Sequence, residues 1–329
     1  MIVFTPQYSA YPRTLTLLVF CLLVVFTFSS CIPKQAPTFR IGLNNWPGYA
    51  PLYLSYIQSA EENPQEYQLI PMASSSDVMH GLRSGTLEAG ALTLDEAIML
   101  SAEGIALRIV LVFDISNGGD ALLANRGIKQ LSQLKGKTIA LEKSTVGSLV
   151  LSRAIAAAGL NHEDIKTQYC LVQDHEKCLA DVDAVITFEP TLSQLMAAGA
   201  INLFDSRQMP NEIIDVLVVN EMVYTSLRKQ ISVLVKQYYK TRTAMLEQNY
   251  TDLTSLADFT GMSRIAFENA LRGIVLPDAD QAEALMSGSP APLRRQIDKL
   301  VEFLKDRGRV DSSTQPQLIV DASFLDSQL

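Results

Sequence analysis

Short β-rich runs alternate with helical stretches between residues 39 and 220, and this alternation limits the possible folds more than any other feature of the sequence. The helical stretches Ser76–Ser84 and Val146–Ala158 carry apolar residues at helical spacing, and Gly159 follows the second. Such alternation predicts parallel α/β sheets with helices on both faces. The expected strands are Phe39–Asn44, Tyr67–Ala73, Ala89–Thr93, Ala106–Ser116, Asp120–Asn125, Lys137–Glu142, Lys166–Val172, Asp183–Pro190, Ile201–Phe204 and Ile213–Asn220.

The chain has 329 residues, which is long enough for two domains, and the pattern divides after residue 118. A second α/β set occupies residues 125–215. We therefore expect two lobes, each a mostly parallel sheet flanked by helices. The expected segments are a first lobe of 38–118 plus 218–329 and an inserted second lobe of 119–217.

The pattern changes to helices after residue 223, and no strong strand is expected between them. These helices are expected at 223–245, 251–272, 279–286 and 291–307 and should pack on the first lobe. Insertion of one lobe into the other makes the chain cross twice, near 117–121 and near 213–219. Two crossings between two lobes predict a hinge.

The N-terminus has the pattern of an export signal. Arg13 is the only charged residue in 1–30, and the apolar run 15–28 is shorter than the ~20 residues that a transmembrane helix needs. We expect a lipoprotein signal peptide at 1–30, with an uncleaved signal anchor as the alternative. Phe28-Ser29-Ser30-Cys31 resembles a bacterial lipobox. Cys31 is therefore expected to carry a diacylglycerol and, through a tether of 31–37, to anchor a periplasmic protein to the membrane.

Composition excludes several classes of protein. Hydrophobic residues make up 48% and charged residues 19% of the chain, which is typical of a globular protein rather than a disordered one. The 27 basic and 35 acidic residues give a net charge of −8, and no basic run occurs. A nucleic-acid partner is therefore not expected, since it needs a concentrated positive surface.

Two cysteines remain after the expected signal peptide and lipid site. Cys170 and Cys178 could form a disulfide, which an oxidising compartment would permit. Two buried thiols are the alternative. His175 lies between them, but a zinc site normally needs a second ligand cluster, and none is visible. We therefore expect no metal site.

Motifs for catalysis are absent from the sequence. The chain has three histidines, His80, His162 and His175, and none has an obvious nucleophile partner. The chain lacks G-x-S-x-G, H-E-x-x-H and G-x-G-x-x-G. We therefore expect neither an enzyme nor a bound cofactor.

Polar residues gather instead where strands meet helices, which is where ligands bind in open parallel sheets. The candidate ligand-binding residues are Asn45, Trp46, Tyr49, Ser75, Ser76, Thr93, Asp95, Asp114, Ser116, Asn117, Ser144, Thr145, Gly147 and Glu189. Trp46, the only tryptophan, could stack on a ligand or simply pack in the core. The hydroxyl residues could bind ligand or cap helices, and the helix start at 144–148 could hold an anionic group.

Carboxylates outnumber basic residues at these junctions. The acidic candidates are Asp95, Asp114, Asp120, Glu142, Glu189 and Asp215, of which Glu189 and Asp114 are the first choices. The nearby basic residues are few, chiefly Lys143. Buried carboxylates are costly unless they are paired, so two of them in a cleft favour a nitrogen-containing organic solute. The alternative is that several cap helices or accept bonds from backbone N–H groups at the hinge.

The order and spacing of several short motifs resemble a known family. These motifs are Ile41-Gly42, Trp46-Pro47-Gly48-Tyr49 with Pro51-Leu52-Tyr53-Leu54, Gly81-Leu82 to Gly85, Glu88-Ala89-Gly90-Ala91, Leu131 to Ala140, Asp183-Ala184-Val185 and Glu189-Pro190. Over residues 38–220 the chain resembles periplasmic solute-binding proteins of type II fold, in the nitrate/sulfonate/taurine and thiamine-precursor group. The resemblance implies a monomer whose two lobes close on a small solute and deliver it to an ABC permease and its ATPase. A sensory lipoprotein that acts on a membrane signalling partner is the alternative.

Overall fold

The computed structural model describes residues 38–62, 67–247 and 253–325, together with residues 1 and 3. Apart from residues 1 and 3, the expected signal peptide lies outside the described residues, and so do the tether and Cys31. No helix in the described part of the chain combines the length and the apolar character needed to span a bilayer.

The chain forms two sheets. The second sheet uses consecutive strands, and the first uses the strands that precede and follow them in the sequence. Among the described residues, seven strands form the first sheet and five form the second. The first sheet contains β1 (Arg40–Leu43), β2 (Gln68–Pro71), β3 (Ala89–Thr93), β4 (Leu107–Ser116), β10 (Ile214–Asn220), β11 (Ile274–Val275) and β12 (Leu318–Val320). The second contains β5 (Asp120–Ala124), β6 (Thr138–Leu141), β7 (Lys166–Tyr169), β8 (Ala184–Phe188) and β9 (Ile201–Asp205).

Both sheets are mixed, whereas mostly parallel sheets were expected. The strand order is β11-β4-β10-β3-β1-β2, with β12 beside β4, in the first sheet and β7-β6-β8-β5-β9 in the second. Strand β10 runs antiparallel to both β3 and β4, and β5 runs antiparallel to both β8 and β9. The difference arises mainly at β5 and β10, each of which is the first strand that the chain forms after it has changed sheets. The short strand β11 adds one more antiparallel pair with β4.

The chain passes between the sheets twice. It leaves β4 for β5 through residues 117–119, inside the expected crossing of 117–121. It returns from β9 to β10 through residues 206–213. This return lies mostly before the expected 213–219, because all of β10 pairs with β4 in the first sheet.

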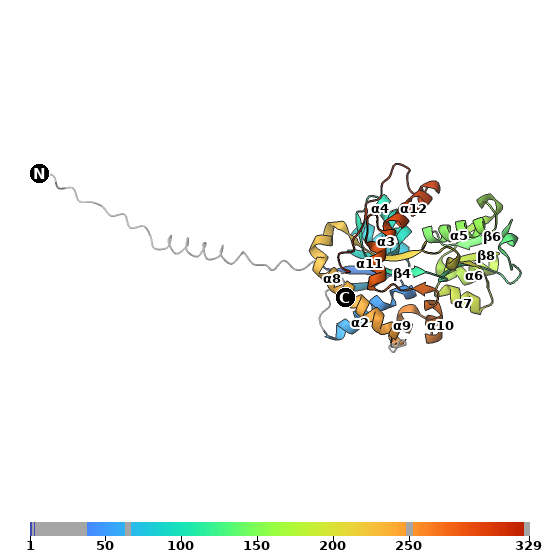
Figure 1. Ribbon diagram of the computed structural model, residues 1–329, viewed down its shortest axis with the longest axis horizontal. Helices are drawn as coiled ribbons and strands as arrows, with labels where there is room; N and C mark the ends of the chain where they lie inside the picture. The colour runs from blue at the N-terminus through green and yellow to red at the C-terminus, as the bar shows by residue number, and fades with distance from the viewer. Residues whose placement is uncertain (2, 4–37, 63–66, 248–252, 326–329) are drawn as a thin grey trace. The chain divides into compact units, whose positions relative to one another are not determined.

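Helices flank both sheets. The first sheet is joined by α2 (Ala50–Glu62), α3 (Ser75–Ser84) and α4 (Leu94–Ala102), and the second by α5 (Thr145–Ala157), α6 (His175–Asp181) and α7 (Thr191–Ala197). In Figure 1, α5, α6 and α7 lie around β6 and β8, whereas α3, α4 and α12 (Pro292–Asp306) lie together. Local signals set the helix ends: Ser74 Oγ accepts a bond from Asp77 N at 3.2 Å before α3, and Gly85, with φ of 71°, ends it.

The C-terminal part is helical, as expected, but it also contains two strands that were not expected. Its helices are α8 (Glu221–Glu247), α9 (Leu253–Thr260), α10 (Arg264–Leu271), α11 (Ala279–Met286) and α12. The expected helix 251–272 is two helices, because Gly261 has a φ of 67° and Ser263 caps α10 through Ala266 N. Strands β11 and β12 both pair with β4.

The core explains why the central strands read as continuous apolar runs. Residues 109–113 of β4 and 216–219 of β10 are fully buried. A strand that is covered on both faces needs apolar side chains on both, so alternation disappears. These two strands support the carboxylates at their ends, which are described below.

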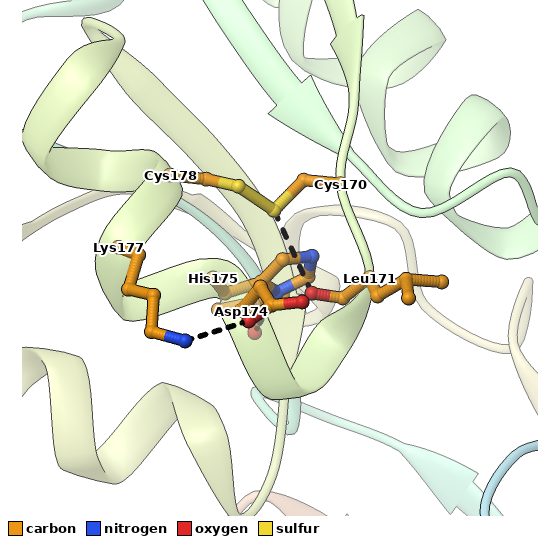
Figure 2. Close-up of a disulfide and its surroundings, with 7 residues drawn as sticks. Cys170, Leu171, Asp174, His175, Lys177 and Cys178 are labelled. Carbon is orange, nitrogen blue, oxygen red and sulfur yellow. Dashed lines mark hydrogen bonds and ion pairs between the residues drawn. A yellow bond between two sulfur atoms is a disulfide. The ribbon is translucent and has the colours of Figure 1, made fainter.

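A disulfide joins Cys170, after β7, to Cys178 in α6, with 6.6 Å between their Cα atoms (Figure 2). This is the pairing considered from the sequence rather than two free thiols. His175 lies beside it and is fully buried, with Nδ1 3.0 Å from Thr187 Oγ1. Within the described residues, no group of three or more His, Cys, Asp or Glu is placed to hold a metal ion.

Candidate functional site

A cavity of about 40 Å³ lies where side chains from both sheets meet. The first sheet and its connections contribute Asn44, Trp46, Tyr49, Ser75, Thr93, Glu96, Ile213 and Asp215. The second contributes Asp120, Glu142, Ser144, Val146 and Phe188. Many of these residues lie at or just beyond the C-terminal end of a strand, which is the usual ligand position in such sheets.

The pairing of β10 with its two neighbours brings two carboxylates and a hydroxyl side by side. Asp215 is directly opposite Asp114 of β4 and directly opposite Thr93 of β3. Side chains at directly opposite positions lie on the same face of a sheet. The antiparallel insertion of β10 is therefore what concentrates acidic groups at this edge of the first sheet.

Two aromatic residues of the segment after β1 donate hydrogen bonds to these carboxylates. Tyr49 donates from its hydroxyl to Asp215 Oδ1 at 2.5 Å, and Trp46 donates from Nε1 to Asp114 Oδ2 at 3.0 Å. Gly48 lies between them, and a Cβ at this position would be 1.9 Å from Asp114 Oδ2. Only glycine lets the segment approach so closely.

Trp46 also meets the second sheet. Its ring packs edge-to-face against Phe188 at the end of β8, with 6.3 Å between ring centroids. Trp46 thus packs in the core, one of the two roles that the sequence left open, and it also lines the cavity.

A second group of hydrogen bonds holds the crossing at residues 117–119, where the chain passes from β4 to β5. Ser116 Oγ donates to Asp120 Oδ2 at 2.6 Å and lies 2.8 Å from Ser206 Oγ. The backbone N–H of Gly118 donates to Ser206 Oγ at 2.6 Å. Residues of the two crossings, 117–119 and 206–213, therefore bond directly to one another.

Burial raises the pKa of the carboxyl groups around the cavity. The pKa of Glu96 is raised to about 8 by burial and by the nearby Asp95, and that of Asp114 to about 8 by burial and by Asp120. Burial raises the pKa of Asp120 to about 7. Burial and the charge of Asp114 raise the pKa of Asp215 well above its ordinary value. No Lys or Arg lines the cavity among the described residues to oppose these shifts.

The helix start at 144–148 is capped by its own chain. Ser144 Oγ accepts a bond from Gly147 N at 3.2 Å, and Ser148 Oγ donates to Ser144 O at 3.1 Å. Thr145 Oγ1 is buried and has no partner among the described residues. Capping therefore accounts for Ser144, which also lines the cavity.

The structure gathers some predicted site residues in the cavity and places others elsewhere. Trp46, Tyr49, Ser75, Thr93 and Ser144 line it. Asp95, Asp114, Ser116, Thr145 and Gly147 are buried but do not line it. Asn45, Ser76 and Asn117 are exposed outside its lining.

Glu189, one of the two first choices, lies at a second cavity. Its Oε1 accepts a hydrogen bond from Ser193 Oγ at 2.7 Å, and its Oε2 accepts one from Ser193 N at 3.2 Å. The Glu189 carboxylate is therefore bonded to the first turn of α7. The second cavity, of about 500 Å³, lies between α7 and α10 and includes Arg207 and Arg272 in its lining.

Several residues of the first cavity were not among the candidate ligand-binding residues. These are Asn44, Glu96, Asp120, Glu142, Val146, Phe188, Ile213 and Asp215. Asp120, Glu142 and Asp215 stood among the acidic candidates at the junctions. Asn44 and Glu96 also lie at junctions, but Glu96 occupies a helix-capping position, and its Oε2 accepts from Thr93 N at 3.1 Å. Nothing in the sequence separates Val146, Phe188 or Ile213 from core residues.

Residues 40–256 match the model of a family described as NMT1/THI5 like. The chain belongs to this family. The match spans every strand of both sheets except β11 and β12. A comparison with curated proteins gives no significant match.

Solved structures share the fold of this NMT1/THI5-like chain at low sequence identity. The alkanesulfonate-binding protein SsuA from Xanthomonas axonopodis pv. citri, bound to MOPS, is 14% identical with a TM-score of 0.72 and aligns over 87% of this chain and 99% of that chain. The periplasmic aliphatic sulphonate binding protein SsuA from Escherichia coli is 18% identical with a TM-score of 0.69 and aligns over 84% and 94%.

A third structure is the ligand-binding component of an ABC-type import system from Staphylococcus aureus, with zinc bound. It is 13% identical with a TM-score of 0.70 and aligns over 88% of this chain and 98% of that chain. The likeness confirms the periplasmic-binding-protein fold and the two-lobed α/β class expected from the sequence. All three neighbours are described as binding proteins or binding components rather than as enzymes.

Proposed function

We propose that this protein is the solute-binding component of an ABC importer and that its two lobes close on a small organic solute. The observation that carries this proposal is the cavity lined from both sheets, with Asp215 on one side and Asp120 on the other. A solute bound there contacts both sheets at once, so it favours their closed arrangement. The family and the fold of the chain support the same function.

The hinge of this movement is proposed at the two crossings. Residues 117–119 and 206–213 carry the chain between the sheets, and Gly118 has a φ of 120° that favours glycine. The lobe boundaries follow as 38–116 plus 214–325 and 120–205. The bonds of Ser206 to Gly118 and Ser116 hold these crossings together in this arrangement.

We assign the solute to nitrogen-containing organic compounds. The neighbours from Xanthomonas and Escherichia are named for sulfonates, which are anions. Here the described lining holds carboxylates and no Lys or Arg. Such a lining suits N–H donors of a solute better than it suits an anion.

We also propose that the protein is anchored to a membrane on its periplasmic side. The expected lipid on Cys31 would hold it at the periplasmic face of a membrane, where it would hand solute to a permease driven by an ATPase. Globomycin, which blocks lipoprotein signal cleavage, should make a larger precursor accumulate, and Cys31→Ser should abolish lipid labelling. An unmodified protein that takes up no lipid label and has the same size with and without globomycin would point to an uncleaved anchor instead.

Gentle mass spectrometry of the protein purified from its own host tests solute binding. We expect a small molecule that co-purifies and is released on unfolding, and X-ray scattering should show a larger radius of gyration after its removal. Trp46→Ala should lose the molecule, because Trp46 lines the cavity and contacts Phe188 of the other sheet. A protein that never carries a molecule and keeps one radius with every solute offered would contradict the proposal.

A further inference from the structure

Four acidic side chains line the cavity, and they come from both sheets. Glu96 and Asp215 belong to the first sheet and its connections, and Asp120 and Glu142 to the second. A closed arrangement brings these groups together in a space that excludes most water. Like charges in such a space repel unless protons or a counter-charge neutralise them.

Three of these carboxylates have an oxygen with no donor. Asp215 Oδ1 accepts from Tyr49, Asp120 Oδ2 from Ser116 and Glu96 Oε2 from the backbone N–H of Thr93, but their second oxygens accept no bond from any described residue. The three residues are only 3%, 5% and 6% exposed and line the cavity, so a donor for these oxygens has to come from within the cavity. A buried acceptor without a donor is costly and points to a bound group that supplies one.

The basic residues closest to this region are engaged elsewhere or face solvent. Lys143 is exposed, and its Nζ lies 5.8 Å from the centre of the Tyr169 ring. Arg207 forms a bidentate pair with Asp205, at 2.9 and 2.6 Å. The counter-charge for the cavity is therefore not supplied by the described lining.

Resting on the proposed function, we propose that the solute carries a cationic nitrogen group, an ammonium or an amidinium, which lies between Asp120 and Asp215. These residues stand at the two crossings, since Asp120 is the first residue of β5 and Asp215 the second of β10. A cation between them attracts a carboxylate from each sheet. The closed arrangement is then stable with the cation present and is opposed by repulsion when the cavity is empty and ionised.

Protons compete with this cation. The groups that face the cavity or lie directly behind it are Tyr49, Asp95, Glu96, Asp114, Asp120, Glu142 and Asp215, with Asp77 and Glu189 near its second-sheet side. Burial raises the pKa of Tyr49, Asp95, Glu96, Asp114, Asp120, Glu142, Glu189 and Asp215, so neutral carboxyl groups predominate in acid. A cation must displace these protons, and its affinity rises with pH. An anion would need the same protons as donors, and its affinity would fall with pH.

Calorimetry of the full chain with charge-matched probes tests the proposal. The panel contains isosteric sets such as benzamidine, benzamide and benzoate, each titrated at pH 5.5, 7.0 and 8.5. We expect the tightest binders to be cations, with affinities about tenfold higher at pH 8.5 than at pH 5.5. Tightest binding by a neutral or anionic member, or affinity that falls with pH, would overturn the cation while the proposed function stands. A panel in which nothing binds would count against the proposed function itself.

Conservative variants locate the cationic group. Asp120→Asn and Asp215→Asn keep an oxygen for Ser116 and Tyr49 but remove the charge. Each should weaken cation binding at pH 8.5 by about tenfold or more, weaken it less at pH 5.5, and leave neutral members unchanged. Asp181→Asn, an exposed position at the end of α6, is the matched control. Equal losses for neutral and cationic members would show a packing role and overturn the assignment to these two residues.

Discussion

Tyr49 donates its hydroxyl to Asp215 across 2.5 Å, and both residues are buried between the segment after β1 and the start of β10. Burial and the charge of Asp215 raise the pKa of Tyr49 well above its ordinary value, so the hydroxyl remains a donor over the working pH range. The bond joins the segment that carries Trp46 to the strand on which the chain returns to the first sheet. Stability and the candidate site therefore depend on the same contact.

Tyr49→Phe should lower the free energy of unfolding by about 1–3 kcal/mol, because it leaves Asp215 Oδ1 buried without its donor. Urea unfolding at pH 8.0 measures this loss. Tyr169→Phe is the matched control, since Tyr169 is 65% exposed and should change stability by less than about 0.5 kcal/mol. Similar losses in the two variants would show that the buried bond contributes nothing of its own.

Gly48→Ala should destabilise the protein by about 1–3 kcal/mol or more, because the added Cβ would lie 1.9 Å from Asp114 Oδ2 and 2.5 Å from Trp46 Nε1. Trp46 is the only tryptophan, so its fluorescence reports both unfolding and any change in this bond. Gly127→Ala, where a Cβ would meet no atom within 4 Å, is the control. A Gly48→Ala protein with unchanged emission and stability would contradict the close approach described here.

Local signals were sufficient for many elements of the fold. The strand Ala89–Thr93 and the helix 279–286 have the bounds expected from the sequence, since apolar patterning and capping residues mark them directly. The antiparallel placement of β10 carries no such mark. Its sequence reads as a buried strand in either direction, and only pairing with β3 and β4, distant in the chain, decides the direction.

The candidate site was predictable as a region but not residue by residue. The rule that ligands lie at strand ends selected Trp46 and Tyr49 as candidates, and both line the cavity. It also selected Asn45, which is exposed, while the neighbouring Asn44 faces inward and bonds to Ser75 Oγ at 3.1 Å. One residue of difference in where the strand ends reverses which side chain faces the cavity, and the sequence does not fix that point.

Removal of the disulfide should destabilise the protein by about 2 kcal/mol, because it closes a short loop between Cys170 and Cys178. The double variant Cys170→Ser with Cys178→Ser is compared with the unmodified protein by thermal unfolding, with and without a phosphine reductant. We expect the reductant to lower the melting temperature of the unmodified protein and to leave the variant unchanged. If the reductant lowered the melting temperature of both proteins equally, its effect would not come from the disulfide between Cys170 and Cys178.

The pH dependence of stability follows from the buried acids. Burial raises the pKa of Glu96 and Asp114 to about 8 and of Asp120 to about 7, so the fold favours their neutral forms. The stability linked to these protons is fully present below the ordinary carboxyl range, near 4, and is lost as the pH rises through about 7 to 8. Burial lowers the pKa of His175 to about 4, which costs stability only on the acid side. The window from pH 6.5 to 8.5 therefore isolates the carboxyl groups.

Thermal unfolding of the solute-free protein should thus show a lower melting temperature at pH 8.5 than at pH 6.5. Asp120→Asn removes one of the titrating groups and should reduce this difference by about 1–2 °C, since about 1 kcal/mol corresponds to that shift in a chain of 329 residues. Asp181→Asn, exposed on α6, should leave the difference unchanged. A melting temperature that is constant or rises over this window would mean that the carboxylates are already ionised and paired in the solute-free fold. That result would contradict two statements made above: that the buried carboxyl groups are neutral in the solute-free protein, and that the described lining of the cavity supplies no counter-charge.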